Sequence, residues 1–244
     1  MSHPPPFDAR LIVARSLSPA VRELTFERLD QQPMVFEPGQ FVSAVLPGAD
    51  GARVKRSYSI ASCPDGSPRF ELAVTRVEGG PASTWLHEMP IETVIRFTGP
   101  QGVFTRAATA SPPSLLIATG TGVAPMRSFI RAAVASGSTT PIWLLLGVRH
   151  EADILYKEEL SEWARTSAHG RFEVTLSQPL GDWVGRRGHV QKHVPELFEM
   201  LANSAEDSPH AYVCGLDRMV RDVRTLLREQ LALPRSSVHG ERYD

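Results

Sequence analysis

The hydrophobic pattern of the chain changes near residue 110, and this change most constrains the fold. In residues 1–105, apolar and polar side chains alternate over short segments separated by turns rich in proline, glycine and aspartate. Alternating segments about ten residues apart are typical of an antiparallel barrel or sandwich. The expected strands lie near 9–15, 20–28, 40–46, 53–61, 69–77 and 92–98, with one helical interruption at 81–89.

Beyond this point the apolar residues form compact runs, each followed by a helical segment. The runs lie at 114–120, 141–148, 171–178 and 210–216. Strands that alternate with helices predict βαβ units and a parallel sheet covered on both faces. Two helix faces are expected in the core: Met126, Phe129, Ile130 and Val134 on one, and Val220, Val223, Leu227 and Leu231 on the other.

The segment RAATASPPS (106–114) has almost no apolar periodicity and is the best candidate for a linker. We therefore predict an N-terminal antiparallel β-barrel domain over residues 1–108. A C-terminal α/β domain with a parallel sheet is predicted over residues 112–244.

Composition limits the possible partners. The formal net charge of −1 over 244 residues gives no electrostatic reason to expect nucleic acid or an anionic membrane. Without a signal peptide or a long apolar run, the chain is expected in the cytoplasm. The two cysteines, Cys63 and Cys214, lie far apart and exclude a four-cysteine metal or iron–sulfur site. His189 and His193 have helical metal-ligand spacing but no acidic neighbour, so we expect surface residues and no metal.

The stretch RSYSIAS (56–62) places an arginine, a tyrosine and hydroxyl side chains within an expected β-strand. On a strand, Arg56 and Tyr58 share one face. The two side chains are either a solvated surface pair or half of a site for a ligand with an anionic end and a flat end.

Two glycine-containing segments favour the second interpretation. In LLIATGTGVAPMRSFI (115–130), Gly120 and Gly122 lie between a buried strand and a helix, where backbone N–H groups can approach an anion. The alternative is a tight turn without a ligand. In GGPASTW (79–85), Gly79, Gly80 and Ser83 open a short helix, so Ser83 is either a phosphate contact or an ordinary N-cap. Together the three segments predict two dinucleotides that meet between two domains.

Six ordered motifs resemble those of the ferredoxin–NADP reductase superfamily. They are R-x-Y-S from Arg56, G-x-x-S from Gly80, GTGVAP (120–125), GVRHEADILYKEEL (147–160), YVCGLDRMV (212–220) and HGERYD (239–244). The resemblance covers essentially the whole chain. It implies an FAD-binding barrel domain, an NAD(P)-binding α/β domain and hydride transfer between NAD(P)H and FAD.

The resemblance also implies roles for single residues on the flavin side. Arg56 would pair with the FAD pyrophosphate, Tyr58 would lie against the isoalloxazine, and Ser59 would approach the flavin N5. Ser57 belongs to the same FAD-binding strand. Gly79, Gly80 and Ser83 would hold the pyrophosphate from the other side.

On the nicotinamide side, the cofactor would be cradled by Thr119, Gly120, Thr121, Gly122 and Pro125. Cys214 and Gly215 would border the nicotinamide, and Ser59, Cys214 and Glu241 form the expected catalytic set. Tyr243 would cover the flavin until nicotinamide displaces it, although Asp244 follows it where relatives end.

The resemblance favours NADPH over NADH, with NADH possible. The paired Ser-Arg that binds the 2′-phosphate in plant-type members has no clean equivalent at Ser177-Gln178, so this role rests on Arg149 and on Arg186 or Arg187. These arginines are either contacts of the 2′-phosphate or surface charges. The electron acceptor would be an external one-electron carrier such as ferredoxin or flavodoxin. The alternatives are an NADH-dependent reductase component of a multicomponent oxygenase and a non-catalytic flavin-binding subunit.

Overall fold

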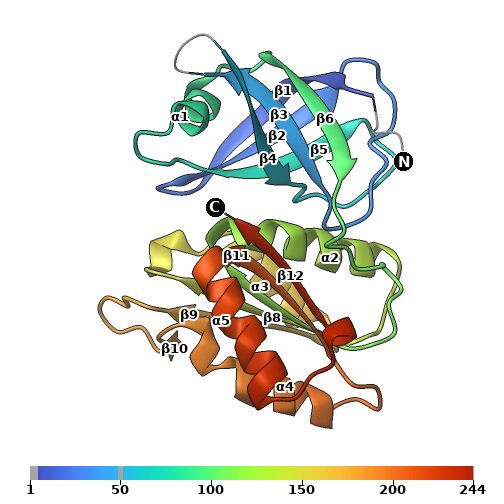
Figure 1. Ribbon diagram of the computed structural model, residues 1–244, viewed down its shortest axis with the longest axis vertical. Coiled ribbons are helices and arrows are strands. Elements are labelled where there is room, and N and C mark those ends of the chain that lie inside the picture. Colours follow the sequence, from blue (N-terminus) through green and yellow to red (C-terminus); the bar gives the residue numbers. More distant parts are fainter. Residues whose placement is uncertain (1–4, 49–51, 244) are drawn as a thin grey trace.

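The computed structural model describes residues 5–48 and 52–243, and Figure 1 shows that they form two units stacked along the long axis. Each unit is built around a six-stranded sheet. The chain completes the first sheet before it starts the second, which agrees with the change of pattern in the sequence.

The first sheet is antiparallel and has the order β4-β3-β6-β1-β2-β5. A bridge between Ile60 and Leu72, and a 2.8 Å hydrogen bond from the Ala61 N–H to the Glu71 carbonyl, connect its two edges. The sheet is therefore a barrel, as predicted. Its strands are β1 (Phe7–Ser18), β2 (Val21–Arg28), β3 (Phe41–Pro47), β4 (Arg53–Ser59), β5 (Arg69–Thr75) and β6 (Val94–Gln101), and helix α1 (Pro81–Glu88) forms the predicted interruption.

Aromatic side chains fill the barrel. The rings of Phe7, Phe26, Phe70 and Phe97 contact one another with centroids 5.0–6.0 Å apart. Offset and edge-on ring contacts of this kind add to the free energy gained by burial. The packed interior leaves the outer strands and the barrel rim as the surfaces on which a ligand can bind.

The second sheet is parallel and has the order β10-β9-β8-β7-β11-β12. Its strands are β7 (Ser114–Thr119), β8 (Ile142–Val148), β9 (Gly170–Leu176), β10 (Arg186–Arg187), β11 (His210–Leu216) and β12 (Val238–Tyr243). The helices are α2 (Val123–Ala135), α3 (Lys157–Thr166), α4 (Val194–Asn203) and α5 (Asp217–Thr225), with short helical turns η1 (Gly120–Gly122), η2 (Glu151–Asp153), η3 (Val190–Lys192), η4 (Leu226–Gln230) and η5 (Arg235–Ser237).

Helices cover both faces of this sheet, as the alternation of strands and helices predicts. Leu116 and Leu144 pack with α2 and α3 on one face, whereas Leu115 and Leu145 pack with α4 and α5 on the other. One expectation fails at the end of α2. Val134 is 59% exposed, because the helix rotates it away from the sheet in its last turn.

The segment 106–114 is less free than a linker. Arg106, at its start, is 1% exposed and donates a 2.9 Å hydrogen bond to the Ser114 hydroxyl at the start of β7. The middle of the segment is exposed, but both of its ends are anchored.

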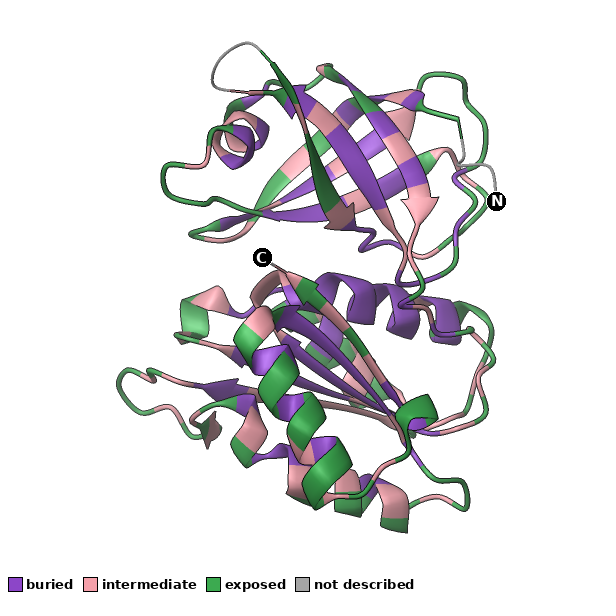
Figure 2. Ribbon diagram, in the orientation of Figure 1, coloured by how far each residue is buried: buried purple, intermediate pink, exposed green. Residues whose placement is uncertain are grey.

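The two units pack tightly against each other. Ala61, Ala73 and Phe104 from the first unit join the apolar cluster around α2, and the Phe104 and Phe129 ring centroids lie 5.6 Å apart. Figure 2 shows buried residues along α2 where it faces the barrel. Among the described residues, none of the helices combines the length and apolar character that a membrane span requires.

Candidate active site

Strand β4 carries the first group of predicted residues to the seam between the units. Arg56 is exposed and donates a 2.9 Å hydrogen bond to the Lys55 carbonyl, while Tyr58 on the same face is half-buried against the barrel core. Burial raises the pKa of Tyr58 to about 12, against the opposing charge of Arg56. Ser57 pairs with Ser43 through their hydroxyls at 3.0 Å. An exposed guanidinium beside a half-covered ring fits a ligand with an anionic end and a flat end.

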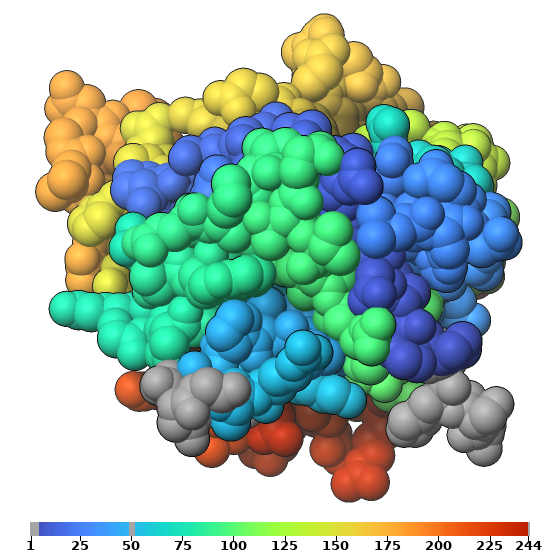
Figure 3. Space-filling view, turned by 90° about the horizontal axis from the view of Figure 1, so that it is seen from above, coloured from blue at the N-terminus to red at the C-terminus, as the bar shows by residue number. Residues whose placement is uncertain are grey.

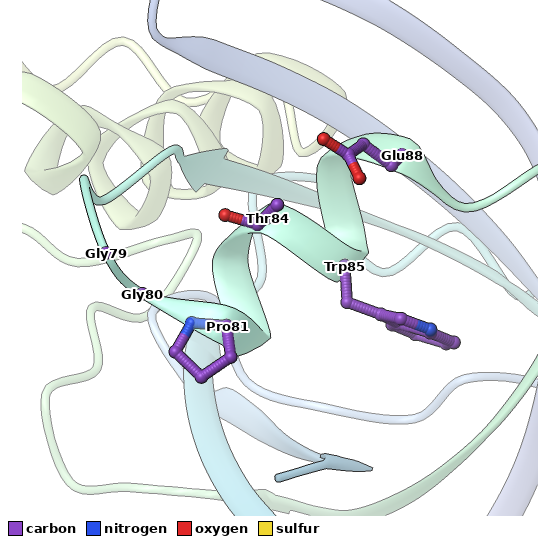
Figure 4. Close-up of a pocket in the computed structure, with 6 residues that line it drawn as sticks. All are labelled: Gly79, Gly80, Pro81, Thr84, Trp85 and Glu88. Atoms are coloured by element: carbon purple, nitrogen blue, oxygen red, sulfur yellow. The ribbon is translucent and has the colours of Figure 1, made fainter. Parts of the chain in front are cut away.

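The glycine segment before α1 lines a pocket of about 460 Å³. Figure 4 shows Gly79, Gly80, Pro81, Thr84, Trp85 and Glu88 around it. Gly79 has a φ of +69°, a conformation that glycine adopts without strain. The backbone therefore approaches the pocket closely at the start of the helix.

The hydroxyl of Ser83 is engaged within the protein. It accepts a 3.0 Å hydrogen bond from the Val77 N–H and donates one of 3.0 Å to the Gly80 carbonyl. Ser83 therefore holds the loop in place. The expectation that it is an ordinary N-cap is wrong, because the helix is capped at Gly80 without a side-chain hydrogen bond and Ser83 lies within its first turn. Thr84 also lines the pocket and brings a second hydroxyl to this side of the helix.

The second glycine loop lies against the end of β11. A Cβ on Gly122 would be 2.2 Å from the Cys214 carbonyl oxygen, and a Cβ on Gly215, whose φ is +140°, would be 2.2 Å from the Thr119 hydroxyl oxygen. Gly120, with a φ of +52°, would meet nothing within 4 Å. Two glycines thus allow close backbone contact, and the third opens onto free space at the carboxyl ends of the strands.

The neighbouring loop residues complete this end of the sheet. Pro125 lies buried in the first turn of α2, where its missing N–H costs no helical hydrogen bond. The Thr121 hydroxyl lies 3.4 Å from that of Thr75 on the barrel. The loop therefore reaches across the seam.

Strand β12 brings Glu241 and Tyr243 to the same place. The Ser59 hydroxyl donates a 2.9 Å hydrogen bond to Glu241 Oε1 and accepts one of 2.5 Å from the Tyr243 hydroxyl. Figure 3 views the molecule from the barrel end. Red residues of the C-terminal part of the chain are visible there beyond the edge of the barrel at which the light-blue residues of β4 lie. Asp244 lies outside the described residues.

The three predicted catalytic residues, Ser59, Cys214 and Glu241, thus meet in one cluster with Tyr243. Cys214 is opposite Glu241 in the β11–β12 ladder and is fully buried. Burial raises the pKa of the Cys214 thiol well above its usual value, and the carboxylate of Glu241 adds to this effect. Burial also raises the pKa of Glu241, against the hydrogen bond from Ser59. The cluster therefore holds a neutral thiol and a carboxyl group that takes up a proton more readily than in water.

The three predicted phosphate-binding arginines have different surroundings. Arg149, just after β8, is exposed, and Arg187 donates a 2.7 Å hydrogen bond to the Trp183 carbonyl. Arg186 is bound to both oxygens of Glu196 at 2.7 and 2.9 Å and lies 3.2 Å from Glu173. Its charge is already balanced by two carboxylates, so Arg186 is a poor candidate for a 2′-phosphate.

The His189–His193 pair does not form a metal site in the described part of the chain. His189 is exposed, as expected, but the expectation of a surface residue is wrong for His193, which is buried because its ring nitrogens face Thr175, the Arg187 carbonyl and Arg186. No cluster of three His, Cys, Asp or Glu side chains suited to a metal occurs among residues 5–48 and 52–243.

The residues at the seam fit two nucleotides. The close contacts of Gly122 and Gly215 leave the carboxyl edge of the sheet accessible to a dinucleotide, while Arg56 and the pocket at α1 suit a second one. Sequence reasoning missed Thr84 and Trp85 in that pocket. The sequence signal that could have found them is a hydroxyl and an aromatic side chain in the first turns of a helix that begins after the glycine pair.

Comparisons with known proteins agree with this architecture. The oxidoreductase FAD-binding domain family matches residues 8–105, and the oxidoreductase NAD-binding domain family matches residues 116–225. The chain belongs to the ferredoxin–NADP reductase superfamily and is an FAD-dependent NAD(P)H oxidoreductase.

Individual proteins with similar sequences or structures include two curated reductases and one solved structure. The chain is 54% identical over 240 residues to ferredoxin–NADP reductase B of Sorangium cellulosum (strain So ce56), covering 98% of each chain. It is 30% identical over 216 residues to the reductase component of phenol 2-monooxygenase from Pseudomonas sp. (strain CF600), covering 87% of this chain and 59% of that one. The crystal structure of the Amycolatopsis cytochrome P450 reductase GcoB superposes with a TM-score of 0.85 at 28% identity, covering 99% of this chain and 71% of that one.

Proposed function

We propose that the protein is a ferredoxin–NADP reductase that uses NADPH and exchanges single electrons with an external carrier such as ferredoxin or flavodoxin, in the cytoplasm. The main support is the hydrogen bond between Ser59 and Glu241, which joins the predicted flavin strand to the carboxyl edge of the parallel sheet. The near full-length relative from Sorangium cellulosum is named for this activity. The proposed division into an FAD-binding domain (1–108) and an NAD(P)-binding domain (112–244) follows the same seam.

In this proposal each residue at the seam has a distinct task. FAD, when bound, would accept a hydride from NADPH and release electrons one at a time. Arg56 would pair with the FAD pyrophosphate, and the backbone of Gly79 and Gly80 would approach it from the α1 side. Tyr58 would cover one face of the flavin.

The catalytic cluster would orient the reacting groups and hold one proton. Ser59 would place its hydroxyl near the flavin N5, and Glu241, with its raised pKa, would accept or return a proton through that hydroxyl. Cys214, as a neutral thiol, would limit the space beside the nicotinamide. Tyr243 would move away from Ser59 when the nicotinamide enters.

The loop after β7 would hold the nicotinamide dinucleotide. Thr119, Gly120, Thr121, Gly122 and Pro125 form the turn, and Gly215 closes it from β11. Holding two reactants in contact makes a bimolecular step effectively unimolecular, which is the largest catalytic contribution we assign to the protein.

Recognition of the 2′-phosphate is assigned to Arg149 and Arg187. Arg149 directly follows β8 and Arg187 is the last residue of β10, so both lie at the carboxyl edge of the sheet, where the adenosine end of a dinucleotide would lie. Arg186 is not part of this proposal because Glu173 and Glu196 bind it.

Anaerobic stopped-flow spectroscopy tests the proposed function. Purified protein with FAD should lose its flavin absorbance near ~450 nm when mixed with NADPH. When oxidised ferredoxin or flavodoxin is then added, the carrier should become reduced as the flavin absorbance returns. A protein that binds FAD but has no diaphorase activity with artificial acceptors would instead be a non-catalytic flavin-binding subunit.

An NADH-dependent reductase component of a multicomponent oxygenase is the second candidate. It is supported by the relative from phenol 2-monooxygenase, although this chain spans only 59% of that protein. The ratio of kcat/KM for NADPH to that for NADH separates the two candidates. A strong preference for NADH would favour the oxygenase system.

A further inference from the structure

A cluster of charged side chains crosses the seam between the barrel domain and the α/β domain, behind the candidate active site. Its centre is Arg127 on α2, whose side chain is 4% exposed. The barrel domain contributes Arg15, Glu23 and Glu71, and the α/β domain contributes Arg127, Arg131 and Glu159. The cluster as a whole is neutral, with one net negative charge from the barrel side and one net positive charge from the other side.

Arg127 contacts both domains at once. Its Nε donates to both oxygens of Glu159 at 2.9 Å, and one terminal nitrogen contacts Glu71 and donates a 3.1 Å hydrogen bond to the Ala61 carbonyl. The guanidinium carbon lies 4.3 Å from the centre of the Tyr156 ring. Although burial opposes its charge, the hydrogen bonds to Glu159 and the nearby carboxylates raise the pKa of Arg127. The side chain is therefore a permanent cation in a fixed geometry.

The position of these contacts in the sequence is informative. Ala61 follows Ser59 and Ile60 directly, so its carbonyl belongs to the extension of the predicted flavin strand. Arg127 lies in the second turn of α2, the helix whose N-cap is Gly122 of the nicotinamide loop. One guanidinium thus joins the strand that would carry the flavin to the helix that would carry the nicotinamide.

We propose that Arg127 is a positioning residue for hydride transfer, which sets the separation of the two cofactor-binding elements by bridging Ala61 and Glu71 to Glu159. This inference rests on the proposed function. Arginine suits this task because its planar fork makes several directed hydrogen bonds, whereas lysine has a single ammonium group. A misplacement of about 1 Å between reacting groups can lower the rate of a step by about 100-fold.

Arg127→Lys tests the proposal, with Arg131→Lys as the matched control. Both variants keep the charge of the same cluster, but Arg131 is 39% exposed and its cluster contacts are to Glu71 and Glu159. We expect Arg127→Lys to lower the saturating rate of flavin reduction by about 10- to 100-fold. The Kd values for NADPH and FAD should stay within about threefold of wild type, since the phosphate contacts remain. Arg131→Lys should change the reduction rate by less than about threefold, as is usual for exposed ion pairs.

A second readout does not depend on turnover. Protein whose flavin has first been reduced and that is then mixed with NADP⁺ should show a long-wavelength charge-transfer absorbance when the nicotinamide and flavin rings are stacked. This absorbance should weaken in Arg127→Lys and persist in Arg131→Lys. The deuterium isotope effect with NADPH labelled at C4 should remain or increase in Arg127→Lys, because hydride transfer itself is slowed.

Several outcomes would overturn the proposal. Equal reduction rates and charge-transfer absorbance in Arg127→Lys and wild type would show that Arg127 does not position the rings. Loss of FAD or of thermal stability in proportion to the rate would show a structural role alone. If Arg127→Lys does not fold, Glu71→Gln weakens the same bridge from the barrel side, and an unchanged reduction rate in that variant would overturn the proposal. Failure of the wild type to be reduced by NADPH would instead refute the proposed function.

Discussion

Substitution of Gly122 by alanine isolates the close contact between the nicotinamide loop and strand β11. The backbone at Gly122 has an ordinary helical conformation, with φ at −59°, so alanine adds no backbone strain. The added Cβ, however, would lie 2.2 Å from the Cys214 carbonyl oxygen and 2.6 Å from its carbonyl carbon. Both neighbours are backbone atoms of a central strand and cannot rotate away. The loop and β11 would therefore have to separate by about 1 Å to reach an ordinary contact.

The expected loss of folding stability in Gly122→Ala follows from the cost of overpacking. Extra volume in a well-packed site usually costs about 1–3 kcal/mol, and we expect the upper end because the clash is with backbone. For a chain of this size, that loss lowers Tm by roughly 6–12 °C. A shift of about 1 Å in the loop should also slow flavin reduction by NADPH by about 100-fold. Differential scanning calorimetry and anaerobic stopped-flow spectroscopy measure the two effects.

Gly137→Ala is the control for this substitution. Gly137 lies beyond the end of α2 with a φ of +69° and open space around its Cβ position. Alanine there should cost about 1–2 kcal/mol through backbone strain alone, with flavin reduction at the wild-type rate. An unchanged Tm and reduction rate in Gly122→Ala would refute the packing argument. An equal loss of rate in both variants would show that the rate follows stability and not loop geometry.

Further predictions concern the other elements of the site. Ser59→Ala should slow flavin reduction by about 10- to 100-fold, the value of a hydrogen bond to a charged group, while the Kd for FAD changes less; the reverse pattern in stopped-flow and flavin-binding data would make Ser59 merely structural. Arg56→Ala should raise the Kd for FAD by about tenfold or more, measured by fluorescence titration of the apoprotein. Arg149→Ala should raise KM for NADPH by about tenfold and leave KM for NADH unchanged. An equal increase of KM for both cofactors would show that Arg149 does not bind the 2′-phosphate. Burial lowers the pKa of His210, with the Arg106 charge adding to it, and burial likewise lowers the pKa of His239 next to His210. Below about pH 6.5 the unfolded chain then binds more protons than the folded chain. The free energy of unfolding should therefore be highest above that pH and fall as the pH drops through the pKa values of the two histidines in the folded state. Urea unfolding at a series of pH values measures this, and a gain in stability on acidification would contradict it.

The architecture could be predicted from the sequence because the order of strands and helices follows from the spacing of the hydrophobic residues. Six alternating segments became the strands of the barrel, and the apolar runs became β7, β8, β9 and β11. The short strand β10 was not predicted, since Arg186 and Arg187 have no apolar pattern. Val134 was placed wrongly because periodicity defines a helix face but not the turn at which that face leaves the core.

The site was predicted in outline, and its details depend on contacts between distant residues. Ser59 and Glu241 could be proposed as neighbours only through the family resemblance, because 182 positions separate them in the chain. The same holds for the engagement of Arg186 by Glu173 and Glu196, which changes its expected role. Buried arginines such as Arg127 have no local signal at all, since a hydrophobic pattern treats arginine as a surface residue.

The charge balance at the seam restricts how the two halves can be recombined. The barrel side supplies one surplus negative charge and the helical side one surplus positive charge, with Arg127 and Glu23 almost fully enclosed. A chimera that joins this barrel to a foreign dinucleotide half without an equivalent of Arg127 would leave one surplus negative charge of the barrel uncompensated at the seam, with Glu23 paired to Arg15 alone, which is unfavourable. A functional hybrid should therefore need the carboxylates of the barrel domain and Arg127 of the α/β domain to be transferred together. The two domains of this reductase are thus exchangeable only as a unit.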